Sequence, residues 1–111
     1  MAQRETLGIL RRRGDFLRIQ KAGRRFKQQY LTVLVGSGPE IVARVGFTVS
    51  RKVGTAVTRN RVRRRLRELT RALKANFGDG LDYVIIAYPS AVQASPAALR
   101  EDLLCALQRV R

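Results

Sequence analysis

Apolar and polar residues alternate along two neighbouring segments of the chain, residues 30–35 and 41–50. The alternating apolar positions of these segments are Leu31, Val33, Val35, Ile41, Ala43, Val45, Phe47 and Val49. Because successive side chains of a strand point to opposite sides, each segment has one apolar side and one mixed side. The pattern predicts two strands of an antiparallel sheet that is covered on one face.

Three other segments have the pattern of helices. Asp15 is a possible N-cap for a short helix over residues 16–22, and Ser95 followed by Pro96 predicts the start of the final helix. A long helix is expected from Thr55 or Thr58 to Asn76. Its apolar positions recur with helical spacing and form one stripe, made of Val62, Leu66, Leu69 and Leu73.

Residues 81–88 are apolar on both sides, which predicts a central strand ended by Pro89. The order helix, two or three strands, helix, strand, helix is typical of an α+β fold. We expect a two-layer sandwich in which helices pack on a mostly antiparallel, four-stranded sheet. No linker or internal repeat interrupts the chain, so residues 1–111 are expected to form a single domain.

The charge of the chain is large and of one sign. Lys and Arg together number 23 against 8 Asp and Glu, giving a net charge of +15. Such a charge repels itself and indicates a polyanionic partner, for which a nucleic acid is favoured over an acidic membrane surface or an acidic protein. Most of the basic residues are arginines, whose planar guanidinium groups bind phosphates and stack on bases.

The arginines are concentrated in the long helix, where six of the nine residues 59–67 are Arg. The side opposite the apolar stripe carries Asn60, Arg63, Arg64, Arg67, Arg71 and Lys74. A solvent-exposed helix face usually mixes charges of both signs, so this face is interpreted as a binding surface. The sequence has no helix-turn-helix spacing, heptads or zinc-ligand set, which favours RNA over DNA.

The mixed side of the two strands is a second candidate surface. Tyr30, Thr32, Thr48 and Ser50 offer hydroxyl groups there, and Phe16 offers a ring on which a base can stack. We expect Phe16 and the arginine-rich helix to form the walls of a groove for an extended single strand. The alternative is that Phe16 and Leu34 belong to a core beneath the first helix.

The segments GFTVSRKVG at 46–54 and AVTRNRVRRRLRE at 56–68 closely resemble the signature of bacterial ribonuclease P protein subunits. The segment LRRRGDF at 10–16 is similar to the N-terminal part of that family, so the resemblance extends over nearly the whole chain. It implies a ribosomal-protein-like fold with a left-handed β-α-β crossover. Gln20 and Leu34 stand where some members have aromatic residues, and Tyr88 stands where an arginine is usual.

The resemblance also implies a function. Ribonuclease P is the endoribonuclease that removes the 5′ leader from precursor tRNA, and its RNA subunit performs the cleavage with Mg²⁺. The protein subunit binds that RNA and the leader, and no cofactor is expected on the protein alone. By matching position, the resemblance implies that RNA is contacted by Arg51, Lys52, Arg59, Asn60, Arg61, Arg63, Arg64 and Arg67. The leader would lie against Phe16, Tyr30, Thr32, Thr48 and Ser50.

The residues that the chain lacks agree with this implication. It has no histidine, and no pair of carboxylates or Cys/His cluster lies near the basic helix, so catalysis by the protein itself is not expected. The single Cys105 and the lack of a long apolar segment or signal peptide favour a cytoplasmic protein that does not enter membranes. A structural RNA-binding protein of ribosomal type, with no role in tRNA processing, is the alternative function.

Overall fold

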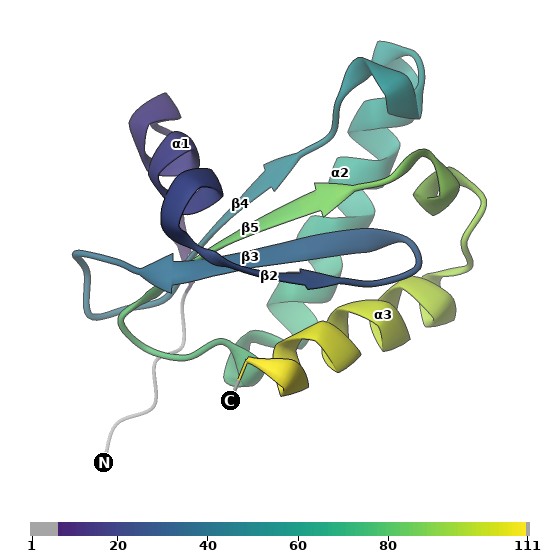
Figure 1. Ribbon diagram of the computed structural model, residues 1–111. Helices are drawn as coiled ribbons and strands as arrows, with labels where there is room; N and C mark the ends of the chain where they lie inside the picture. The colour runs from purple at the N-terminus through teal and green to yellow at the C-terminus, as the bar shows by residue number, and fades with distance from the viewer. Residues whose placement is uncertain (1–6, 111) are drawn as a thin grey trace.

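The computed structural model describes residues 7–110, which form one mixed sheet and three α-helices (Figure 1). The strands are β1 (Gly8–Ile9), β2 (Arg24–Lys27), β3 (Leu31–Ser37), β4 (Arg44–Thr48) and β5 (Leu81–Ala87). The helices are α1 (Arg13–Ala22), α2 (Ala56–Ala72) and α3 (Pro96–Arg109). Short 3-10 turns lie at η1 (Arg51–Val53), η2 (Lys74–Asn76) and η3 (Pro89–Val92). None of the helices in this part of the chain is long and apolar enough to cross a membrane.

The sheet has five strands in the order β1-β4-β5-β3-β2, with β5 in the centre. β4 is parallel to both β1 and β5, whereas β3 is antiparallel to both β5 and β2. The prediction of a four-stranded, mostly antiparallel sheet was therefore wrong. β1 is too short and β2, with the sequence RRFK, too charged to show the alternation of a strand. β4 and β5 are parallel because α2 carries the chain back between them.

Helices cover both faces of the sheet, so the two-layer prediction was also wrong. On one face, α2 and α3 pack against the main core, to which the sheet contributes Leu31, Val33, Val35, Val45, Tyr83 and Ile85. On the other face, Ile19 of α1 packs with Leu10, Leu34 and Val84 in a smaller core (Figure 1). Leu34 is thus a core residue, which is the alternative considered from the sequence. The two cores place α1 and α2 on opposite sides of the sheet.

The connection from β4 through α2 to β5 is left-handed. In Figure 1 both strands point to the right with β4 above β5, and α2 lies behind them. About 98% of such connections in proteins are right-handed, so this feature could not be predicted from general rules. Only the family resemblance implied it.

The structure confirms the predicted N-cap at Ser95, and of the two predicted starting points of the long helix it selects Thr55, which caps α2. The side-chain oxygen of Thr55 accepts a hydrogen bond from the Thr58 amide at 3.3 Å, and that of Ser95 accepts one from the Ala98 amide at 3.1 Å. Asp15 is not a cap, because α1 begins earlier, at Arg13, and places Asp15 in its first turn. Its carboxylate takes part in an ion-pair cluster described below.

Candidate nucleic-acid interface

The two sides of α2 differ as the sequence predicts. Val62, Leu66 and Leu73 are buried and Leu69 is half-buried in the main core, so the apolar stripe faces the sheet. The opposite side is open to solvent at Asn60, Arg61, Arg64, Arg67 and Arg71, and half-buried at Arg59, Arg63 and Arg65. Packing of the leucine stripe, at about 25 cal/mol per Å² of buried apolar surface, fixes the rotation of the helix and therefore aims the arginines outward.

No arginine of α2 forms an ion pair with a carboxylate of residues 7–110. Arg63 instead donates a hydrogen bond to Oδ1 of Asn60 at 2.8 Å, which holds its guanidinium along the helix surface. Glu68 is exposed, but it does not pair with Arg64 or Arg65. The protein therefore leaves a dense group of positive charges for an external anion to neutralise.

The guanidinium of Arg59 is not fully satisfied within the described part of the chain. Its Nε is the one buried side-chain nitrogen or oxygen in the described part of the chain without a hydrogen-bond partner. Buried polar groups nearly always have a partner, because an unpaired one costs about 1–3 kcal/mol. Arg51 and Lys52 lie close by in sequence, exposed in η1 just before α2. The start of α2 is thus strongly cationic.

Two other arginines are neutralised inside the protein. Asp82 of β5 is fully buried, and Arg44 donates to its two oxygens at 2.9 and 2.7 Å. Arg18 of α1 donates to Oδ2 of Asp82 at 2.6 Å and to the carbonyl of Ser37 at 2.6 Å. Asp15 lies 3.3 Å from Arg18 and 3.5 Å from Arg44. These arginines tie α1 to the sheet, which separates their role from that of the arginines on α2.

The pKa of Asp82 reflects the same contacts. Burial by itself would raise the pKa, but the hydrogen bonds from Arg44 and Arg18, together with their charges, outweigh burial and hold the pKa below its ordinary value. Asp82 is therefore ionised at neutral pH, and the cluster has a defined charge.

On the α1 side of the sheet, Phe16 lies at the edge of the small core and is half-buried. Its ring lies so close to β4 that a Cβ atom at Gly46 would be 2.5 Å from its Cζ, so only glycine leaves room for it. Ile86 of β5 is half-buried beside the same core and was not anticipated from the sequence. Phe16 is thus both a packing residue and a partly exposed ring.

The hydroxyl-bearing residues expected near Phe16 are partly brought together. Thr48 of β4 and Thr32 of β3 lie beside Ile86 of β5, one on each neighbouring strand. Thr32 is buried, and its hydroxyl is hydrogen-bonded to the Tyr88 hydroxyl. Ser50 is exposed just beyond β4.

Tyr30 departs from this group. Its ring packs against the main core, on the α2 and α3 side, and its amide donates to Oδ2 of Asp102 at 2.6 Å. Because α1 and α2 cover opposite faces, Phe16 and the arginines of α2 also do not form two walls of one groove (Figure 1). The chain passes from one surface to the other at the end of β4, through Ser50 and η1.

RNA binding should weaken steeply with salt. If about six phosphates are neutralised, a plot of log affinity against log salt concentration should have a slope of roughly −4 to −6. Replacing Arg64 and Arg67 by glutamine should flatten the slope by about 1.4–1.8, whereas Arg100→Gln on α3 should leave it unchanged. A slope near zero for the unaltered protein would show that charge neutralisation is not the main source of affinity.

Known proteins similar to this chain share one family description. A family model described as Ribonuclease P matches residues 6–111. The ribonuclease P protein component of Paramagnetospirillum magneticum is 43% identical over 110 residues, covering 94% of this chain and 83% of the relative. That of Streptomyces avermitilis is 44% identical over 114 residues, covering 95% and 93%.

Solved structures give the same result. The ribonuclease P protein of Thermotoga maritima aligns with a TM-score of 0.83 at 34% identity, over 92% of this chain and 96% of that one. The Staphylococcus aureus protein aligns with a TM-score of 0.81 at 25% identity, over 96% and 97%. These matches favour the main assignment over a ribosomal protein, and the chain belongs to the ribonuclease P protein family.

Proposed function

We propose that this chain is the protein subunit of ribonuclease P, which binds the catalytic RNA and the 5′ leader of precursor tRNA and thereby promotes removal of the leader. The observation that carries the proposal is the row of α2 arginines that no carboxylate of residues 7–110 neutralises, in a chain of this family. A cytoplasmic location stays a prediction, to which the free thiol of Cys105 lends support.

The arginine side of α2 and the α1 side of the sheet would bind different parts of the RNA. The arginines of α2, with Arg51 and Lys52, would bind phosphates of the RNA subunit, since guanidinium groups pair with phosphate oxygens through two hydrogen bonds. The α1 side of the sheet would bind the leader, with Phe16 and Ile86 offering apolar contact and Thr48 a hydroxyl group. The position of η1 supports this division, because η1 lies in the chain between β4, which carries Thr48, and α2, which carries the arginines.

Cleavage itself would belong to the RNA subunit and to Mg²⁺ bound there. The carboxylates near the α1 surface do not suit a magnesium site, because Asp15 and Asp82 are engaged by Arg18 and Arg44. Within residues 7–110, no three potential ligand side chains lie together to hold a metal ion. The part left to the protein is to attract, position and distinguish RNA.

Recognition of the leader is tested with Phe16→Ala in the complete ribonucleoprotein. We expect the variant to bind precursor tRNA more weakly, by up to about 1–3 kcal/mol for a lost stacked base, and mature tRNA equally well. The matched control is Leu17→Ala, which removes an apolar side chain that is 50% exposed on the same helix. The measurement is the ratio of the two dissociation constants. Equal binding of leaderless and leader-bearing tRNA by the unaltered complex would contradict the proposal.

A further inference from the structure

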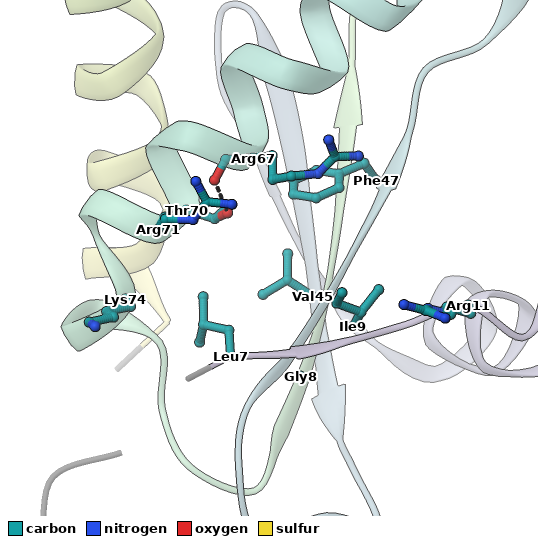
Figure 2. Close-up of a pocket in the computed structure, with 10 residues that line it drawn as sticks. All are labelled: Leu7, Gly8, Ile9, Arg11, Val45, Phe47, Arg67, Thr70, Arg71 and Lys74. Carbon is teal, nitrogen blue, oxygen red and sulfur yellow. Dashed lines mark hydrogen bonds between the residues drawn. The ribbon is translucent and has the colours of Figure 1, made fainter. Parts of the chain in front are cut away.

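A groove of about 650 Å³ lies between β1 and α2, on the face of the sheet opposite Phe16. Figure 2 shows β1 on one side of it, α2 on the other, and Val45 and Phe47 of β4 between them. The α2 side contributes Arg67 and Arg71 from the C-terminal half of the helix. The sequence had placed Arg67, Arg71 and Lys74 on the binding side of the long helix, but it gave no sign that residues of β1 and β4 lie beside them.

The floor of the groove is apolar and in part uncovered. Phe47 is half-buried against the main core, and Ile9 of β1 is 62% exposed although it is a large apolar residue. An exposed isoleucine beside an aromatic ring offers a flat surface that a planar apolar group can cover. The groove therefore has contact surface that the described part of the chain does not use.

The rim of the groove is cationic. Arg11, Arg67 and Arg71 line it together with Lys74, and no acidic residue between positions 7 and 110 does. Arg67 and Arg71 are exposed and form no ion pair with a described carboxylate. Apolar floor and cationic rim together match a ligand that is flat and apolar at one end and anionic at the other.

We infer that this groove binds one unstacked nucleotide of the RNA partner, with its base on Ile9 and Phe47 and its phosphate on Arg67 and Arg71. A nucleotide combines the required ring and charge, and proteins bind single unpaired bases in this way, by stacking the base and pairing the phosphate. The inference rests on the RNA-binding function proposed above. It adds to that function a second base-binding site, on the side of the sheet away from the proposed leader surface.

The test is a titration of the isotope-labelled protein with adenosine 5′-monophosphate, followed through the amide resonances of Ile9, Phe47 and Thr70. We expect the nucleotide to bind about tenfold more tightly at these residues than either adenosine or inorganic phosphate. Ile9→Ser and Arg71→Gln should each weaken binding there about five- to tenfold. The Ile9 variant should fold, because backbone hydrogen bonds hold β1 in place: the Gly8 amide donates to the Ala43 carbonyl at 2.8 Å, and the Leu10 amide donates to the Val45 carbonyl at 3.0 Å.

Matched controls are available for both variants. Ile41→Ser alters an isoleucine that is 67% exposed outside the groove, and Arg100→Gln alters an exposed arginine of α3, so neither should change the titration. Tighter binding of the acidic peptide acetyl-Glu-Phe-Glu-amide than of the nucleotide would overturn the inference in favour of a protein partner. Unchanged resonances would overturn it as well. The proposed function is tested separately, by comparing the binding of precursor and mature tRNA to the complete ribonucleoprotein. Failure of the groove inference can therefore be distinguished from failure of the proposed function.

Discussion

Replacing Leu66 with alanine is expected to lower the free energy of unfolding by about 2–5 kcal/mol, as for other large-to-small changes in a core. Leu66 is fully buried at the centre of the contact between α2 and the sheet, so the lost side chain leaves a cavity. Leu17→Ala makes the same chemical change at a half-exposed site on α1 and should cost about 0.5 kcal/mol or less. Urea unfolding followed by circular dichroism measures both.

The arginines on the other side of α2 should behave in the opposite way. Arg64→Ala and Arg67→Ala should change the unfolding free energy by about 0.5 kcal/mol or less, because both side chains are exposed and pair with none of the described carboxylates. The same two variants should lose RNA affinity. A stable Leu66→Ala variant, or unfolding of the arginine variants, would mean that α2 is rotated relative to the orientation described here.

The second large effect is expected at Asp82. Asp82→Asn removes the charge that Arg18 and Arg44 share, and breaking such a buried pair costs about 3–5 kcal/mol when both partners are buried. Because the Arg18 side chain is 39% exposed and can be hydrated, we expect a smaller loss, roughly 2–4 kcal/mol at pH 7. The control Glu101→Gln alters an exposed carboxylate of α3 and should have little effect.

The loss should also depend on pH. The folded-state pKa of Asp82 is lowered, so its ionised form stabilises the protein above the ordinary pKa of an aspartate, about 3.9. This stabilisation disappears as the pH falls through the lowered pKa. The difference in unfolding free energy between the unaltered protein and Asp82→Asn should therefore be constant near neutral pH and shrink below about pH 4. A difference that does not change down to pH 2 would show that Asp82 acts only through packing.

Much of the architecture follows from simple patterns in the sequence. The stripe of Val62 and Leu66 fixed the orientation of α2 correctly, because a 3.6-residue period leaves few ways to bury it. The central position of β5 followed from its apolar residues on both sides. The alternation of apolar and polar residues, however, shows which side chains share a side of a strand. It does not show whether the neighbouring strands run parallel or antiparallel to it. The parallel pairs of β4, and the charged edge strand β2, were missed for that reason.

The candidate site was predictable in part. The distribution of charge along the sequence was enough to predict the arginine-rich face of α2. It could not show that Arg18 and Arg44 pair with Asp82, because these partners lie far apart in the sequence. Alternation placed Tyr30 and Thr32 on the same side of a strand. Tyr30, however, is the residue before β3, and its ring packs against the main core instead. The groove at β1 could not be predicted, because a strand of two residues is too short to show an alternation of apolar and polar side chains.

We propose that this protein assists an RNA catalyst by binding RNA through the arginines of α2. The most direct measurement is cleavage of precursor tRNA by a bacterial ribonuclease P RNA at low Mg²⁺, with and without the protein. We expect the protein to raise the rate about tenfold or more, equivalent to about 1.4 kcal/mol, and to cleave nothing by itself. A variant with Arg63, Arg64 and Arg67 changed to glutamine should remain folded and fail to stimulate. Cleavage by the protein alone, or no stimulation by the folded, unaltered protein, would contradict the account.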